Sequence, residues 1–167
     1  MYPPLDPLFS SAREPEDIAA IVLESALELT GRPRGNVQLA RWTEAGGLEI
    51  VAQRGFEEEF LACFRRVSIR DTCACGRALI KRSLITVDDV RTDPGLAPYR
   101  DVLDRAGVRS VQSFPLLSSS GAMVGMLSLH DEVAGPGNLA QLHSISALAL
   151  SAANAIIAIR ASRRQVH

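Results

Sequence analysis

The sequence lacks the features that mark secreted, nucleic-acid-binding or disordered proteins. It has only three cysteines, Cys63, Cys73 and Cys75, an odd number that forms no framework of paired disulfides. Its 18 basic and 19 acidic residues leave a net charge of -1, so no broad basic surface for nucleic acid is expected. Residues 1–7 lack the basic start and apolar run of a signal peptide. We therefore expect a cytoplasmic protein that binds no nucleic acid.

The sequence also has no internal repeat, no low-complexity tract and no phosphate-binding glycine loop. No serine can be matched to a base and an orienting acid, so a hydrolase triad is not predicted. What the chain does have is the composition of an ordinary folded domain, with 167 residues of which 47% are hydrophobic and 22% are charged. A chain of this kind is expected to form one globular domain.

The most informative pattern runs from residue 107 to residue 130, where two alternating segments flank the turn Ser118–Gly121. The pattern predicts an antiparallel hairpin, in which successive side chains point to opposite faces. One face is predicted to be apolar and buried. The other is predicted to hold a ligand, and it carries Ser110, Gln112, Phe114, Met126, Ser128 and His130.

Long helices are predicted near both ends of the chain. Residues 15–29 have the spacing of an amphipathic helix. A second helix is predicted over residues 139–159, with Asn138 as its N-cap. A heptad-like seam runs along it and is the candidate dimer or signalling surface, formed by Leu142, Ile145, Ala149, Ala152, Ile156 and Ile159.

Two interpretations of this second helix remain open, because periodicity cannot count the partners of a helix. It is either a core helix of one domain, or a helix that packs on its own domain with one side and on a second subunit with another. The segment is long enough to span a membrane. A span is nevertheless not predicted, because Gln141, His143, Asn154 and several serines interrupt the apolar run.

The remaining predicted elements are short. Gly46 and Gly47 turn the chain between two strands, and Asp71 is expected to cap a helix by accepting hydrogen bonds from free N–H groups. The elements are strands over residues 36–41, 48–53 and 84–87, and helices over residues 57–65, 73–81 and 99–105, with a linking run through Ile69.

The order of these elements implies few parallel crossovers, so we predict an α+β fold with an antiparallel sheet. The long terminal helices would cover one face of the sheet, and the short helices and loops would cover the other, over a pocket. If the first strand lies beside the last, Asn36 and Gln38 join the polar hairpin residues at that pocket.

Five segments, taken in order and spacing, resemble those of a known family. They are residues 35–39, 51–56, 75–79 and 87–94, and the hairpin of residues 107–128. The chain resembles the GAF domain, a small-molecule-binding sensory module, in the form found in bacterial sensor histidine kinases and related signalling proteins. The resemblance covers residues 12–163, with a flexible segment 1–11 before the domain and a tail 164–167 leading to a possible output domain.

The resemblance implies a six-stranded antiparallel sheet, an unidentified small-molecule ligand, a homodimer formed through the terminal helices, and a part in two-component signal transduction. Cys75 and Arg77, at the start of the predicted helix 73–81, join the pocket candidates, since an arginine can pair with an anionic ligand. The domain itself is not expected to be an enzyme, because any histidine kinase activity would belong to an output domain.

Three ligand classes of the family do not fit the sequence. The Asn-Lys-Phe-Asp-Glu signature of cyclic-nucleotide-binding members is absent. Bilin-binding members share an element like Asp71-Thr72-Cys73, but Ala74 replaces their phenylalanine and no Cys-His pair exists for attachment. Haem would need His130, and a lone histidine at a strand end more often forms a hydrogen bond than binds a metal.

The cysteines leave an enzymatic alternative open. A GAF-fold enzyme reduces free methionine sulfoxide, and the spacing of Cys63 and Cys73 resembles part of its pattern, but this chain lacks a further cysteine after Cys75. Cys73 and Cys75 lie near a predicted helix N-terminus, which favours the thiolate form, and with Cys63 they are the redox candidates. Small apolar packing is the simpler interpretation.

Other sites are not predicted. Three cysteine sulfurs are too few for a structural zinc site, so no metal is expected. Asp88, Asp89 and Asp93 have the sequence context of turn caps. A third functional alternative is a dimerisation module whose pocket is filled by its own side chains.

Overall fold

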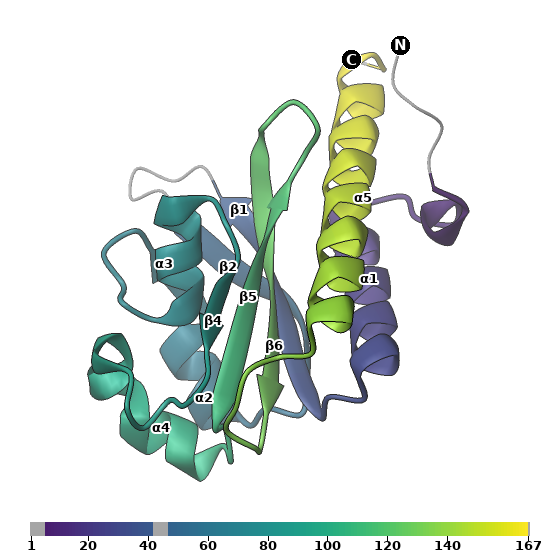
Figure 1. Cartoon of the computed structure of the whole chain (residues 1–167). Coiled ribbons are helices and arrows are strands. Elements are labelled where there is room, and N and C mark those ends of the chain that lie inside the picture. The colour runs from purple at the N-terminus through teal and green to yellow at the C-terminus, as the bar shows by residue number, and fades with distance from the viewer. Residues whose placement is uncertain (1–5, 42–46, 167) are drawn as a thin grey trace.

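A computed structural model describes residues 6–41 and 47–166, and within them the chain forms a helix-covered sheet (Figure 1). The strands are β1 (Arg34–Arg41), β2 (Gly47–Arg54), β3 (Arg66–Ser68), β4 (Ile85–Val87), β5 (Ser110–Leu117) and β6 (Met123–Asp131). The helices are α1 (Pro15–Thr30), α2 (Glu58–Phe64), α3 (Ala74–Lys81), α4 (Arg100–Arg105) and α5 (Leu139–Arg164), with 3-10 turns η1 (Pro7–Phe9) and η2 (Pro94–Tyr99).

The six strands of the described residues form one antiparallel sheet in the order β3-β2-β1-β6-β5-β4. The first strand lies beside the last, which was the condition for placing Asn36 and Gln38 at the pocket: Asn36 is opposite Ser128 and Gln38 is opposite Met126. This pairing closes the middle of the sheet with residues that are far apart in the sequence. The α+β fold with a six-stranded antiparallel sheet is therefore confirmed.

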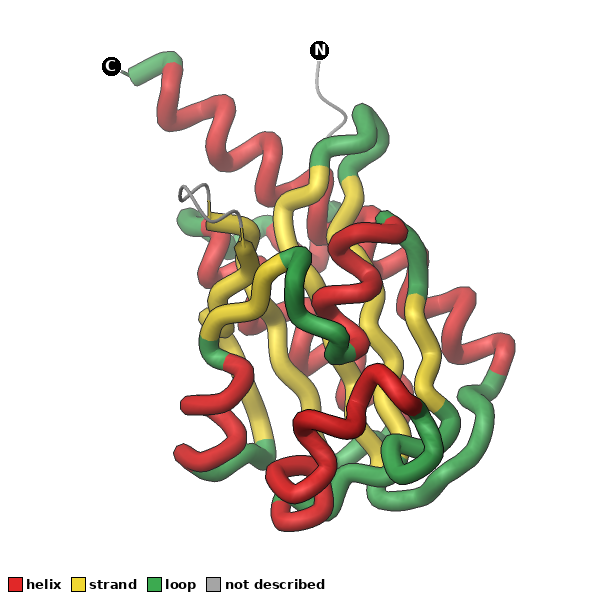
Figure 2. Tube along the Cα trace, turned by 90° about the vertical axis from the view of Figure 1, so that its left-hand side faces the viewer, coloured by secondary structure: helices red, strands yellow, loops and turns green. Residues whose placement is uncertain are grey.

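The two faces of the sheet carry different layers. The long helices α1 and α5 pack side by side on one face, and the short helices α2, α3 and α4 lie on the other (Figure 1). Figure 2 looks onto the short helices, with the strands behind them. Each layer has its own apolar core, since Val37, Leu39 and Leu127 pack with α1 and α5, whereas Leu48, Val111 and Met126 pack with the short helices.

The seam on α5 belongs to the core of this chain. Ile145, Ala149, Ala152, Ile156 and Ile159 are all buried in the cluster formed with α1 and the sheet, and Leu142 packs at its edge. The expectation that this seam forms the dimer contact is wrong, because a heptad-like spacing describes any buried helix face and does not name its partner. The apolar residues that α5 leaves exposed are others, Leu139 and Leu150 among them.

α5 passes a test of length and composition for crossing a membrane, as the sequence suggested. Core helices pass the same test, and α5 contacts α1, β5 and β6 along its course. The Asn138 side chain accepts a hydrogen bond of 3.0 Å from the Gln141 N–H, which confirms the predicted N-cap.

Smaller differences have local causes. Residues 66–68 pair with β2 as strand β3, where a linking run was expected. Asp71 does not cap α3: its carboxylate accepts from the Ser68 N–H at 2.7 Å and so closes the preceding turn, and Cys73 takes the N-cap position. Phe9, in the segment before α1, is fully buried in the core formed with α1 and α5. Residues 1–5, Gly46 in the predicted turn, and His167 lie outside the described residues.

Candidate functional site

A cavity lies between the sheet and the layer of short helices. Its free space is about 30 Å³, which is room for about two water molecules. The lining comes from three strands and from the helical layer: Asn36, Gln38, Phe60, Phe64, Cys73, Ala74, Cys75, Leu96, Leu103, Val111, Ser113, Ser128 and His130. No charged side chain is part of this lining.

Three polar atoms of the lining have no hydrogen-bond partner. They are Asn36 Oδ1, Gln38 Oε1 and His130 Nδ1, on side chains whose exposed fractions are 4%, 1% and 5%. The Gln38 amide nitrogen donates to the Phe64 carbonyl at 3.3 Å, which leaves its oxygen as the free atom. A buried polar atom without a partner costs about 1–3 kcal/mol, so three of them around one cavity mark a place where an occupant can donate hydrogen bonds.

His130 lies among aromatic rings. Its imidazole meets Phe56 and Phe60 edge to face, with ring centroids 4.9 and 5.6 Å away. Burial, followed by the positive charges of Arg32 and Arg34, lowers the pKa of His130 to about 3. The side chain is therefore neutral in the folded protein, and an unprotonated ring nitrogen can accept a hydrogen bond.

Two serines face each other across the neighbouring strands β5 and β6. Ser113 is directly opposite Ser128, and their hydroxyl oxygens are 2.7 Å apart. One hydroxyl donates to the other, so one O–H of the pair is free to turn toward the cavity or another acceptor. Ser128 was predicted at this site, whereas Ser113 was not.

Two thiols complete the polar part of the lining. Cys73 Sγ and Cys75 Sγ are 3.3 Å apart at the start of α3. The hydrogen bond from Cys75, with the Gly76 N–H, lowers the pKa of the Cys73 thiol, while the same contact and burial raise that of Cys75. Of the two thiols, Cys73 is therefore the one that loses its proton more readily. Cys63 is exposed on α2 and is not part of the lining.

Three predicted pocket residues lie on the opposite face of the sheet. Phe114 is buried in the core with α1 and α5. Gln112 lies under the loop entering α5, since a Cβ on Gly137 would overlap its side-chain amide. The Ser110 hydroxyl donates to the Val133 carbonyl at 2.8 Å. The prediction that Ser110, Gln112 and Phe114 line the pocket is therefore wrong.

A register shift in the hairpin explains this error. Beside the turn Leu117 is opposite Met123, and continuing that register would place Gln112 opposite Ser128. An irregularity between Leu116 and Leu117 changes the register by one, so Ser113 takes that place instead. A shift of one residue moves every side chain of a strand to the other face.

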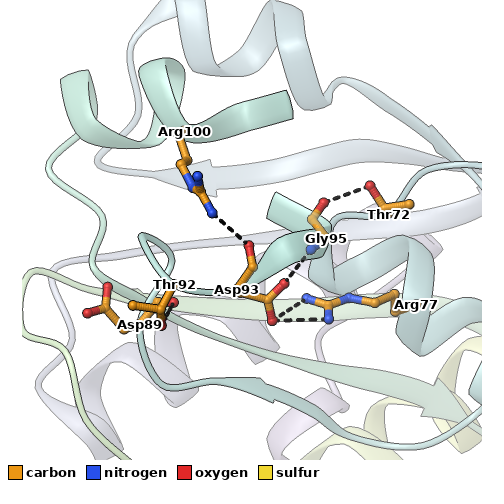
Figure 3. A network of polar contacts seen from close by, with 7 residues as sticks. All are labelled: Thr72, Arg77, Asp89, Thr92, Asp93, Gly95 and Arg100. Carbon is orange, nitrogen blue, oxygen red and sulfur yellow. Dashed lines mark hydrogen bonds and ion pairs between the residues drawn. The ribbon is translucent and has the colours of Figure 1, made fainter. Parts of the chain in front are cut away.

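Arg77 and Met126 also lie outside the lining. Met126 is fully buried on the pocket side of the sheet, as packing for the helical layer. The Arg77 guanidinium donates twice to one Asp93 carboxylate oxygen, at 3.1 and 3.2 Å, and so does not point at a ligand (Figure 3).

The contacts of Asp93 hold the segment that covers the cavity. Its other carboxylate oxygen accepts from the Gly95 N–H at 2.9 Å, and the Thr72 hydroxyl donates to the Gly95 carbonyl at 2.7 Å (Figure 3). These bonds connect η2, which contributes Leu96 to the lining, to the start of α3, which contributes the thiols. Asp93 caps η2 as expected of a turn residue, and no cluster of metal-ligating side chains occurs in residues 6–41 and 47–166.

The apolar part of the lining was missed from the sequence. Phe60 and Phe64 stand one helical turn apart on α2, and Leu96 and Leu103 come from η2 and α4. The spacing of Phe56, Phe60 and Phe64 was a readable signal of one aromatic helix face. Which sheet face these short helices cover is decided by long-range packing, so that signal could not locate the site alone.

The profile of a known family decides the identity of this fold. The profile described as GAF domain matches residues 12–157. The chain belongs to the GAF domain family. This confirms the resemblance inferred from the five sequence segments, and a search of curated proteins found no match.

Several solved structures have the same fold as this chain. A domain of a two-component sensor histidine kinase protein from Sinorhizobium meliloti is 17% identical, with 87% of this chain and 93% of that chain covered and a TM-score of 0.69. A GAF domain/HD domain protein from Geobacter sulfurreducens is 16% identical, with 93% and 99% covered and a TM-score of 0.74. Free methionine-R-sulfoxide reductase from Neisseria meningitidis, solved with its substrate, is 19% identical, with 93% and 85% covered and a TM-score of 0.76.

Proposed function

We propose that this GAF domain is a cytoplasmic sensory module that binds a small molecule between the sheet and the short helices, as part of a two-component or related signalling protein. The observation that carries the proposal is that three buried residues lining one cavity, Asn36, Gln38 and His130, each have a polar atom without a hydrogen-bond partner. Membership of the family and the histidine kinase neighbour support the signalling role.

The chemistry of the cavity favours a neutral ligand that donates hydrogen bonds. Amide oxygens of Asn36 and Gln38 and the neutral His130 ring are acceptors, and no carboxylate of the lining would balance a positive charge. Phe60 and Phe64 supply apolar surface for the rest of the molecule. Because the free space is only about 30 Å³, a ligand larger than a few atoms requires η2 and α4 to move outward.

Two contacts support transmission from the cavity to α5. Ser113 and Ser128 lie on the β5–β6 hairpin, and the turn of that hairpin is bonded to α5: the Ser119 N–H donates to Asn154 Oδ1, and the Asn154 amide donates to the Ser119 hydroxyl, both at 2.9 Å. A ligand that shifts the hairpin would shift this contact. We propose that a second copy of the chain packs on the exposed side of α5 and that the dimer passes the change to an output domain.

The ligand proposal is tested by native mass spectrometry of the purified chain. We expect a retained small molecule on the wild type and its loss from Gln38→Leu, because leucine removes both the oxygen acceptor and the amide. The matched control is Gln112→Leu, which removes a buried amide on the other face of the sheet and should keep the adduct. Wild-type protein without an adduct, and without thermal stabilisation by any compound of a metabolite library, would contradict the proposal.

A thiol-dependent reductase is the second candidate, favoured by the position of Cys73 in the lining and by the fold of the Neisseria enzyme. Consumption of free methionine sulfoxide by the wild type in the presence of a dithiol reductant, and its loss in Cys73→Ser, would support this function. Absence of consumption by the wild type would remove it.

A further inference from the structure

We propose that Cys73 and Cys75 form an oxidisable dithiol that a small hydroperoxide, admitted to the cavity, converts to an intramolecular disulfide. This reaction goes beyond ligand sensing and does not require a dimer. It concerns the two sulfurs at the start of α3, whose contact distance is 3.3 Å. This proposal and the ligand proposal can fail independently, because this one is tested by the oxidation state of the two cysteines and the other by the mass of a retained small molecule.

The free space matches the proposed oxidant. Hydrogen peroxide has two heavy atoms and two O–H donors, and a space of about 30 Å³ holds about two water molecules. The unpaired acceptors Asn36 Oδ1, Gln38 Oε1 and His130 Nδ1 belong to the same lining as both thiols. They can accept the peroxide hydrogens and hold its oxygens among the sulfurs, without any movement of the short helices.

The two thiols have different roles in the reaction. The two sulfurs are 3.3 Å apart, and the contact with Cys75, together with the Gly76 N–H, lowers the pKa of the Cys73 thiol, so we assign Cys73 as the attacking thiolate. The thiolate attacks one peroxide oxygen, the O–O bond breaks, and Cys73 becomes a sulfenic acid while the other oxygen leaves as hydroxide or alkoxide and takes up a proton. Cys75 then attacks the Cys73 sulfur, the S–S bond forms, the S–O bond breaks, and water leaves. Two thiols and one hydroperoxide give one disulfide, one alcohol or water molecule, and one further water.

The position of the pair gives the reaction a structural consequence. Cys73 is the N-cap of α3 and Cys75 is in its first turn, so drawing the sulfurs together moves the start of this helix. Gly76 leaves no slack there, because even a Cβ at this position would overlap the Asp71 carbonyl oxygen. The start of α3 is joined to η2 through the bonds of Thr72 to Gly95 and of Arg77 to Asp93 (Figure 3). Oxidation should therefore loosen the cover of the cavity.

Peptide mapping tests the proposal directly. Trypsin cleaves after Arg70 and Arg77, so both thiols lie in the peptide 71–77 and Cys63 lies in another, 55–65. After treatment with hydrogen peroxide and alkylation of free thiols, the peptide 71–77 should have lost two hydrogens and carry no alkyl group. Cys63 should remain alkylated, and the matched control Cys63→Ser should react as the wild type does.

The variants separate this reaction from its alternatives. Cys75→Ser should stop at a sulfenic acid on residue 73 that a dimedone probe labels, and Cys73→Ser should give no such label on Cys75. Alkylation of both thiols in the peroxide-treated wild type, a disulfide that includes Cys63, or loss of two hydrogens only with free methionine sulfoxide would overturn the proposal. Faster hydrogen exchange in residues 93–99 after oxidation is the expected conformational readout, and unchanged exchange would overturn the coupling to the cavity cover.

Discussion

His130 is neutral because it is enclosed by Phe56 and Phe60 and faces the charges of Arg32 and Arg34. The pKa of His130 is about 3 in the folded protein, against a usual value of 6.5. Between these pH values the unfolded chain therefore binds a proton on this residue that the folded chain does not bind. The stability that depends on the neutral ring is complete above pH 6.5 and is lost progressively as the pH falls toward 3.

This difference in the pKa of His130 between the folded and the unfolded chain gives a testable prediction. Lowering the pH from 6 to 5 should cost the wild type roughly 1 kcal/mol more of unfolding free energy than it costs His130→Gln, which cannot titrate. Urea unfolding at a series of pH values measures the difference. His143→Gln, the same substitution at an exposed position on α5, serves as the control. Equal slopes for the wild type and His130→Gln would show that the imidazole is not held neutral.

At the scale of elements, the two sides of α5 should respond differently to substitution. Ile156→Ala opens a cavity in the core shared with α1 and should reduce the free energy of unfolding by about 3 kcal/mol. Leu150→Ala removes a side chain that is 43% exposed and should change it by no more than about 0.5 kcal/mol in the monomer. Urea unfolding at low protein concentration measures both, and a similar loss for the two would contradict the assignment of the buried side.

The elements also show which features of the fold can be predicted from sequence patterns. Alternation predicted both strands of the 107–130 hairpin, and capping residues predicted where α5 begins. The same alternation placed Gln112 in the pocket and left Ser113 out, because the register shift at Leu116 is invisible in a pattern of polar and apolar residues. Phe114 and Leu116 alternate with Gln112 on the same face of β5, and these two apolar residues were the available sign that this face is the core.

At the scale of the whole molecule, the proposed dimer is the property to test. The seam that suggested it is occupied by the core, so a partner must use the exposed side of α5, where Leu139 and Leu150 are 81% and 43% exposed. We expect light scattering to give twice the monomer mass for the wild type and the monomer mass for Leu150→Arg, with unchanged circular dichroism. A wild-type monomer at high protein concentration would contradict the proposed dimer, and it would not affect the proposals about the cavity.

The sequence by itself determined the elements and their order, because strand alternation, helix spacing and capping depend on residues within a few positions of one another. It also determined the family, through the order of short segments along the chain. The tertiary structure decided which residues share a cavity. One register shift exchanged Gln112 for Ser113, α2 and η2 brought Phe60 and Leu96 over the sheet, and the pairing of β1 with β6 set Asn36 opposite Ser128. Such contacts join residues distant in sequence, and only the folded chain fixes their register.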